Sequence, residues 1–303
     1  MSIIKVMEKF KSQEDCIEFL EYLRFNGNPY CPLCGNHNVS RKNPQDATER
    51  WRCRSCRSSF NVLSGTIFSG TRTPLRIWFL AIVLMTYQKK GISSYALAEL
   101  LDISQDNAWR IQDKIRQEMY AEANETLVQA ITGIAEMDET YVSIKTEYPH
   151  SSWTDKMAIL GVTSRTGKVA MRRTYSTDNE SMQWFVSQYL DLNNVTLYTD
   201  QYRGYAKMKE IVEHAFVKRK YGKFIDDIHT NGMESLWTVV KRTFRGTYYH
   251  CSEERINNFL AEISFRLNWR HLKREQILKQ FLKFCLFKHR DITYHVINDS
   301  WML

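Results

Sequence analysis

The chain has 303 residues, 43% of them hydrophobic, which is enough apolar material for one large core or two to three small ones. Forty-two Lys and Arg against 34 Asp and Glu give a net charge of +8, which favours a polyanionic partner without identifying it. The longest apolar run, residues 77–87, is shorter than the roughly 20 residues that span a bilayer, and charges interrupt the N-terminus where a signal peptide needs an apolar segment. We therefore expect no membrane partner and a cytoplasmic location.

The first predicted element is a helix over residues 5–25, which leads into two Cys-x-x-Cys pairs. These are CPLC, with Cys31 and Cys34, and CRSC, with Cys53 and Cys56. Each pair can direct two thiolates at one ion, and tetrahedral Zn²⁺ needs two such pairs brought together. The spacing predicts one structural zinc ion in a zinc ribbon, with free or redox-active cysteines as the alternative.

Basic and aromatic side chains alternate around these cysteines. We predict that Arg52, Arg54 and Arg57 hold phosphates of a nucleic acid on this small module. A solvated surface or a protein contact is the alternative interpretation.

A helical region follows the cysteines. Pro74 begins a strongly apolar helix that extends to about residue 88, and residues 94–116 then form two helices around the turn DIS. The pair resembles a helix-turn-helix, whose second helix would present Asn107, Arg110 and Lys114 to DNA. Ordinary packing of a helical hairpin gives a similar pattern.

From residue 134 the pattern changes to four strands, with a helix near 179–191 between the third and the fourth. A helix near 203–213, a strand at 215–219 and long helices to about residue 285 are predicted next. Asp138 lies in the first strand and Asp200 directly follows the fourth. A carboxylate at a strand end is well placed to project into a crevice.

The helix that contains HTNGMESLWTVVKRTFRG has an apolar stripe, with Glu234 and Lys241 on one shoulder of it. Seven residues correspond to about 10 Å along a helix, so the two side chains align but are too far apart for a local salt bridge. Three acids from distant segments, Asp138, Asp200 and Glu234, suit two hard divalent cations such as Mg²⁺. Lys241 suits a phosphate.

The assignment of these acids has alternatives, because other acids lie beside them. They are Glu136, Glu139, Asp226 and Asp227.

The segments EMDETYV, LYTDQYRGY and HTNGMESLWTVVKRTFRGTYYH resemble motifs of bacterial insertion-sequence transposases that carry a zinc ribbon before a DDE domain and are related to the Merlin elements. The resemblance covers about residues 15–275. Asp138, Asp200 and Glu234 match the catalytic acids of that family, and Lys241 matches the lysine that often follows the last acid. Asp138 is preferred to its neighbours because it occupies the DET position.

The resemblance implies an α/β, ribonuclease H-like fold: a mixed five-stranded sheet flanked by helices and preceded by the zinc ribbon and the helix-turn-helix. It also implies two catalytic Mg²⁺ or Mn²⁺ ions, cleavage at the element's ends and transfer of the strand into target DNA. The location would be bacterial and nucleoid-associated. The expected domains are a helix and zinc ribbon over 1–70, a helical region over 71–125, a catalytic domain over 130–275 and a tail over 276–303.

Further residues are expected to contact double-stranded DNA, namely the element's terminal inverted repeats and the target. They are Lys218, Arg219, Lys220, Lys241 and Arg245. His229 and Asn231 match the third motif and would support the site, although a helix N-cap explains Asn231 equally well. Because two DNA ends must be brought together, a homodimer or higher oligomer is expected. A structure-selective nuclease and a non-catalytic DNA-binding regulator are the alternative functions.

Overall fold

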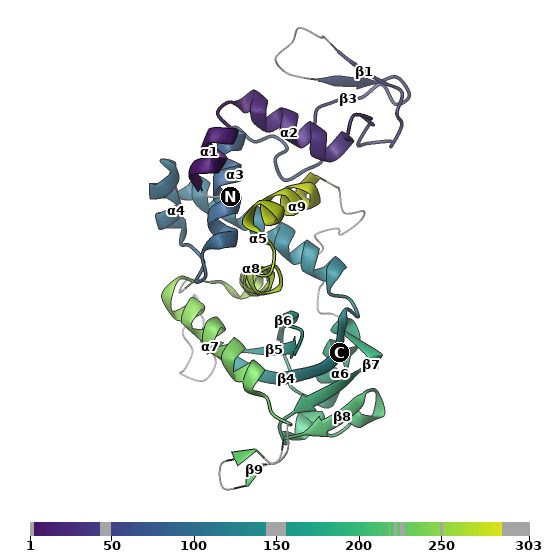
Figure 1. Ribbon diagram of the computed structural model, residues 1–303, viewed down its shortest axis with the longest axis vertical. Helices are drawn as coiled ribbons and strands as arrows, with labels where there is room; N and C mark the ends of the chain where they lie inside the picture. Colours follow the sequence, from purple (N-terminus) through teal and green to yellow (C-terminus); the bar gives the residue numbers. More distant parts are fainter. Residues whose placement is uncertain are drawn as a thin grey trace. The chain divides into compact units, whose positions relative to one another are not determined.

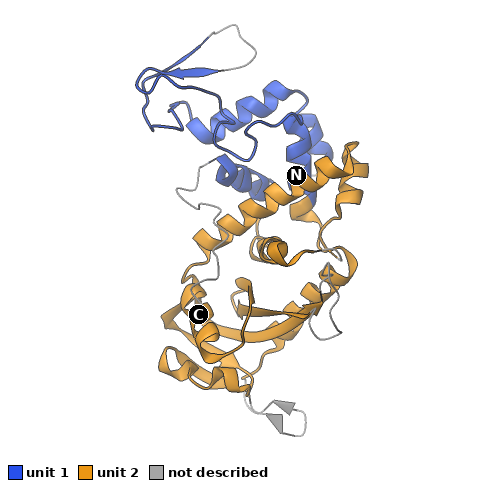
Figure 2. Ribbon diagram, turned by 180° about the vertical axis from the view of Figure 1, so that it is seen from behind, with its two compact units in different colours: residues 1–84, 273–303 blue, residues 85–272 orange. Residues whose placement is uncertain are grey.

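The computed structural model describes residues 3–42, 50–143, 156–217, 228–248 and 251–286, and the backbone of 219–220 and 223–224. The chain forms two compact units (Figure 2). One contains residues up to 84 and from 273 onward, and the other contains residues 85–272.

The first unit combines helices with a small sheet. Its elements are α1 (Ile3–Lys9), α2 (Gln13–Phe25), β1 (Val39–Arg41), β2 (Trp51–Cys53), β3 (Ser59–Phe60), most of α3 (Leu75–Tyr87) and α9 (Arg274–Leu286). Helix α2 starts at a capping box, in which Ser12 Oγ accepts the Asp15 N–H and Asp15 Oδ2 accepts the Ser12 N–H. Among the described residues no helix is long and apolar enough to cross a membrane.

Helix α9 lies across the predicted boundary between residues 275 and 276. Its apolar side, which includes Ile277, Phe281 and Leu282, is buried, and the helix packs against α2 within the first unit. The helix therefore continues into the segment predicted as a tail. The division into four domains stays a prediction.

The second unit is built on a five-stranded sheet in the order β6-β5-β4-β7-β8. Strands β4, β5 and β6 are antiparallel, whereas β7 runs parallel to β4 and β8 parallel to β7. The strands are β4 (Ile131–Ser143), β5 (Lys156–Ser164), β6 (Val169–Thr174), β7 (Leu190–Thr199) and β8 (Glu213–Phe216). This is the mixed sheet expected of a ribonuclease H-like fold.

Helices cover both faces of the sheet (Figure 1). The helices of this unit are α4 (Ser94–Leu101), α5 (Gln105–Thr126), α6 (Asn179–Tyr189), α7 (Asn231–Gly246) and α8 (Ile256–Asn268). Short 3-10 helices and a small hairpin complete it: η1 (Arg203–Tyr205), η2 (Met208–Glu210), η3 (Glu253–Arg255), β9 (Arg219–Lys220) and β10 (Lys223–Phe224). Helix α6 packs with one face of the sheet around Phe185 and Leu197, and α7 and α8 pack with the other around Val240 and Ile159. The predicted helices on both faces are confirmed.

The predicted two-helix unit is formed by α4 and α5. Helix α4 ends at Asp102, whose φ of 50° is left-handed, and Ser104 begins α5 by accepting the Asn107 N–H. Helix α5 then continues to Thr126, past the predicted end near residue 116, and packs against α8. The pair is therefore part of the same compact unit as the sheet.

A charged cluster is buried between α5 and α8. Glu262 is fully buried and accepts hydrogen bonds from Arg116 Nε at 2.7 Å, from Arg266 and from the Tyr248 hydroxyl. The Arg116 guanidinium also lies 4.2 Å from the ring centre of Phe259. Two arginines thus share one carboxylate in the protein interior.

Glu122 on α5 makes stability depend on pH, because burial raises the pKa of its carboxyl to about 7. The unfolded chain releases this proton at a pKa of about 4.3. The contribution of Glu122 to stability is therefore intact below the unfolded pKa and is lost as pH rises toward the folded pKa. Between about pH 5 and about pH 8, the free energy of unfolding in urea should fall by about 2 kcal/mol more for the wild type than for Glu122→Gln. Equal pH dependence in the two proteins would contradict this.

Candidate active site

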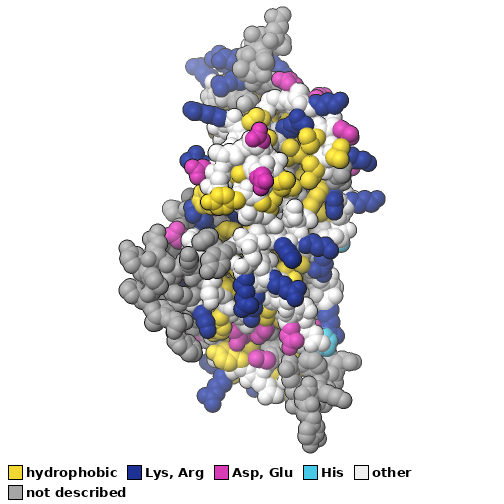
Figure 3. Space-filling view, turned by 90° about the vertical axis from the view of Figure 1, so that its left-hand side faces the viewer, with side chains coloured by type: hydrophobic (Ala, Val, Ile, Leu, Met, Phe, Trp, Pro, Cys, Tyr) yellow, Lys and Arg dark blue, Asp and Glu magenta, His cyan; other side chains and the backbone are white. Residues whose placement is uncertain are grey.

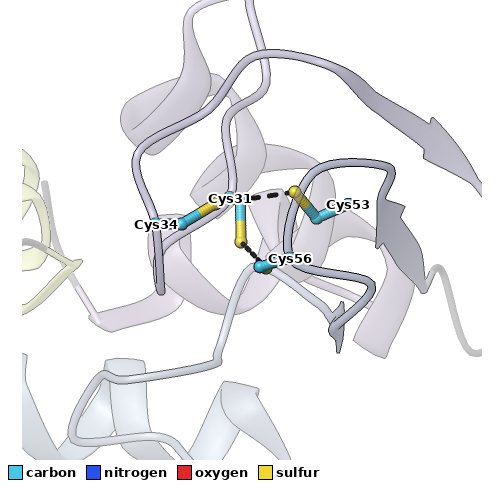
Figure 4. A group of neighbouring side chains, drawn as sticks. All are labelled: Cys31, Cys34, Cys53 and Cys56. Atoms are coloured by element: carbon cyan, nitrogen blue, oxygen red, sulfur yellow. Dashed lines mark hydrogen bonds between the residues drawn. The ribbon is translucent and has the colours of Figure 1, made fainter.

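The four paired cysteines converge on one point (Figure 4). The Sγ atoms of Cys31 and Cys56 are 3.6 Å apart, as are those of Cys34 and Cys53, and all four lie within 4.8 Å of one another. Zn–S bonds of about 2.3 Å place the sulfurs of a regular tetrahedron about 3.8 Å apart, so the cluster fits zinc. The predicted four-cysteine arrangement is confirmed.

Replacing one of these thiols should release the metal. We expect Cys53→Ser to lose about one zinc ion per chain and to unfold the segment around β1 to β3, because zinc binding supplies folding energy to a module of this size. Zinc content by atomic absorption measures the loss, and Cys16→Ala, at a buried cysteine outside the cluster, is the control. Full zinc content in Cys53→Ser would refute the assignment.

Three acids from separate segments meet in the second unit. Asp138 lies on β4, Asp200 directly follows β7, and Glu234 lies in the first turn of α7. Glu136 on β4 is paired with Tyr198 on the parallel strand β7. Asp138 and Asp200 each lie two residues further along, so the two carboxylates lie side by side. All three acids line one pocket of about 400 Å³. The structure thus brings together the acids that the sequence singled out.

Asp138 is oriented by a tryptophan that sequence reasoning did not identify. Asp138 pairs with Gly161 on β5, and Trp237 of α7 lies over that glycine so closely that a Cβ there would be 2.4 Å from the indole. The indole Nε1–H can therefore donate to Asp138 Oδ2, at 2.8 Å. Burial raises the pKa of Asp138, and this hydrogen bond opposes the increase.

Lys241 lies two turns after Glu234 on the same helix and is exposed. Burial raises the pKa of Asp138, and the positive charge of Lys241 opposes that increase. Figure 3 looks onto the side of the molecule that carries α7 and shows acidic side chains gathered beside Lys and Arg side chains. A negatively charged pocket with a basic border can hold both cations and phosphates.

Glu136 does not line the acid pocket. Its Oε2 accepts the backbone N–H of Gly232 at 2.7 Å, and its Oε1 lies 3.4 Å from His229 Nδ1 and 3.8 Å from Arg165 Nε. Glu136, His229 and Arg165 line a different cavity, of about 580 Å³. The predicted site-support residue His229 therefore contacts Glu136.

Asn231 is the first residue of α7, and the N-cap position belongs to Thr230. The N-cap interpretation of Asn231 was therefore wrong by one residue. The N–H of Gly232, in the first turn of the helix, pairs with the carboxylate of Glu136 on β4.

Glu139 points to the opposite face of β4 from Asp138, because neighbouring residues of a strand alternate. Its Oε2 accepts the Tyr205 hydroxyl at 2.6 Å, and Tyr205 is 2% exposed. Burial raises the pKa of both groups. The remaining alternative acids, Asp226 and Asp227, lie outside the described residues.

Most of the predicted DNA contacts whose side chains are described are exposed. Exposed residues among them are Arg52, Arg54, Arg57, Arg110, Lys114, Lys241 and Arg245, and Asn107 is half-buried. Lys218 and the side chains of Arg219 and Lys220 lie outside the described part of the chain. DNA contact by all these residues stays a prediction.

Two family descriptions match the chain. Residues 130–268, which include the sheet, α7 and α8, match the ISXO2-like transposase domain. Residues 11–59 match the transposase zinc-ribbon domain. The three acids therefore lie in the segment that matches a transposase domain, and the four clustered cysteines lie in the segment that matches a transposase zinc ribbon.

A relative that the match covers almost completely comes from a transposable element. It is an uncharacterised protein in transposable element ISH50 of Halobacterium salinarum, 23% identical over 303 residues, and the match covers 92% of this chain and 99% of the relative. This relative is archaeal, and the bacterial origin expected for this chain stays a prediction. The relation to Merlin elements stays a prediction.

Among solved structures, the strand transfer complex of Mos1 is 12% identical, covering 66% of this chain and 77% of that chain, with a TM-score of 0.30. A pre-cleavage Mos1 transpososome is 11% identical, covering 66% and 78%, with a TM-score of 0.26.

Proposed function

We propose that the protein is a DNA transposase that cleaves strands at the ends of its insertion sequence and joins them to target DNA. One observation carries the proposal: Asp138, Asp200 and Glu234, from three separate segments, line one pocket within the domain that matches a transposase. Carboxylates gathered in this way are the ligands that Mg²⁺ and Mn²⁺ prefer.

The acid pocket has the donor set for two divalent cations. Asp138, Asp200 and Glu234 would hold them, with Asp138 fixed by Trp237. Bound there, the ions would stabilise charge on the attacking and leaving oxygens of a phosphoryl displacement. Lys241 would bind a phosphate of the same strand and keep it in register with the acids.

The chemistry proceeds in two displacements. Water attacks the phosphorus at the element's end, the bond to the 3′-oxygen breaks, and the products are a 3′-hydroxyl on the element and a 5′-phosphate on the flank. The 3′-hydroxyl then attacks a phosphodiester of target DNA. A new P–O bond joins the element to the target, and the P–O3′ bond of the target strand breaks, which leaves a 3′-hydroxyl on that strand. No covalent bond to the protein is needed, and no oxidant or nucleotide is consumed.

Recognition of the element's ends is assigned to the surfaces outside the acid pocket. Asn107, Arg110 and Lys114 on α5 would contact the terminal repeats, and exposed arginines of the zinc ribbon would hold phosphates. Because both ends of the element must be joined, the active form would be at least a dimer on DNA, in the cytoplasm beside the nucleoid.

The proposal is tested by incubating the purified protein and Mg²⁺ with element-end DNA and a supercoiled plasmid. We expect end cleavage followed by covalent joining of the element's 3′-end to the plasmid. Cleavage without joining would support a structure-selective nuclease on the same fold. Binding with neither reaction would support a DNA-binding regulator.

A further inference from the structure

We infer that the two glutamates on either side of Asp138 are positioning residues, which fix the segments carrying Glu234 and Asp200 to the strand that carries Asp138. The inference rests on the proposed function, since it concerns the same pocket. Each acid of the segment Glu136–Glu139 then has a role. Asp138 lines the pocket, and the glutamates before and after it hold other parts of the pocket in place.

Glu136 fixes the helix of Glu234. Glu136 is only 3% exposed, and its carboxylate accepts the N–H of Gly232, two residues before Glu234. The contact depends on glycine, because a Cβ at position 232 would lie 2.7 Å from Glu136 Oε2. A negative group at a helix N-terminus is also favourable to the helix dipole. The start of α7 is therefore held to β4 two residues along the strand from Asp138.

Glu139 fixes the segment of Asp200. Tyr205 belongs to η1, the turn that begins three residues after Asp200, and its hydroxyl donates to Glu139 Oε2 at 2.6 Å. The same segment is held locally, because Asp200 Oδ1 accepts the N–H of Tyr202 at 2.8 Å. The buried tyrosine thus connects the turn after β7 to the strand next to it.

Neither glutamate is placed as a metal ligand. Both oxygens of Glu136 are engaged, by Gly232 on one side and by His229 and Arg165 on the other, and the side chain lines the separate cavity of about 580 Å³. Glu139 faces the other side of the sheet from Asp138. Groups that hold metal ligands in position typically change metal affinity by about 10- to 100-fold when they are removed.

The test is Mn²⁺ affinity of the full-length, zinc-loaded protein without DNA, measured by titration calorimetry and by electron paramagnetic resonance of free Mn²⁺. We expect Tyr205→Phe and Glu136→Ala to raise the Kd for Mn²⁺ by about 10- to 100-fold. Glu139→Gln and Glu136→Gln keep an oxygen that can accept the hydrogen bond and should stay close to the wild type. Tyr141→Phe removes a hydroxyl from an exposed tyrosine on the same strand and is the matched control.

Wild-type Mn²⁺ affinity in Tyr205→Phe and Glu136→Ala would overturn the inference. A loss in Glu139→Gln as large as that in Glu139→Ala would also overturn it, because Glu139 would then act as a ligand. Thermal unfolding of each variant shows whether a loss of Mn²⁺ affinity comes from a loss of the fold. Tyr205→Phe removes only one oxygen atom, so this variant should stay folded. The proposed function fails separately, if Asp138→Asn retains metal-dependent DNA cleavage.

Discussion

Asp138→Asn should reduce Mg²⁺-dependent strand cleavage by about 10³-fold or more, because losing several kcal/mol of metal-supplied stabilisation corresponds to that factor. The change keeps the size of the side chain and an oxygen that can accept the Trp237 hydrogen bond, but removes the charge. Asp200→Asn and Glu234→Gln should have effects of the same order, since all three acids line one pocket. Cleavage of labelled element-end DNA is the measurement.

Binding of the same DNA without metal provides the control, and it should be unchanged in all three variants. Glu213→Gln alters an exposed acid on β8, outside the pocket, and should cleave like the wild type. Robust cleavage by any one of the three purified pocket variants would remove that acid from the mechanism.

Glu262→Ala should cost about 3–5 kcal/mol of unfolding free energy, the typical result of leaving a buried charge without its partner. Arg116 and Arg266 both hydrogen-bond to this carboxylate, and all three side chains are almost completely buried. Removing Glu262 leaves two buried guanidinium groups without their shared carboxylate. Urea unfolding, followed by tryptophan fluorescence and circular dichroism, measures the effect.

The matched control is Glu253→Ala, which removes the partner of Arg173 in a pair whose acid is half exposed. Arg173 is 11% exposed, but Glu253 lies at the surface, so solvent screens the pair and the loss should be about 1 kcal/mol, well below that of Glu262→Ala. Equal destabilisation by the two changes would show that the buried cluster is not held by its charges.

Several elements follow from local patterns in the sequence, and the structure confirms them. The apolar stripe of α7 faces the core as predicted. Its buried residues are Met233, Leu236, Trp237, Val240 and Phe244. The cysteine spacing predicted a cluster because the chemistry of zinc requires it. Glu234 could be singled out because the same stripe left it on a shoulder of the helix.

Other features depend on contacts between distant segments, which no local pattern encodes. The residue paired with Asp138 on β5 is Gly161, whose lack of a side chain leaves room for the Trp237 indole to reach Asp138. The prediction of one helix near 203–213 is wrong, because two short 3-10 helices, η1 and η2, occur there. Tyr205 and Met208 are buried in the core, and the Asn179 side chain accepts the Lys207 N–H. The helix predicted over 5–25 is interrupted by the capping box at Ser12, a signal that was present as Ser-x-x-Asp.

Anomalous X-ray diffraction from crystals of the wild-type protein soaked in Mn²⁺ would show directly whether the three acids bind metal. We expect two manganese peaks about 3.5–4 Å apart in the pocket, bound by carboxylate oxygens of Asp138, Asp200 and Glu234. Manganese bound by Glu136 or Glu139 in place of these three acids, or a pocket without manganese in a saturated crystal, would contradict it.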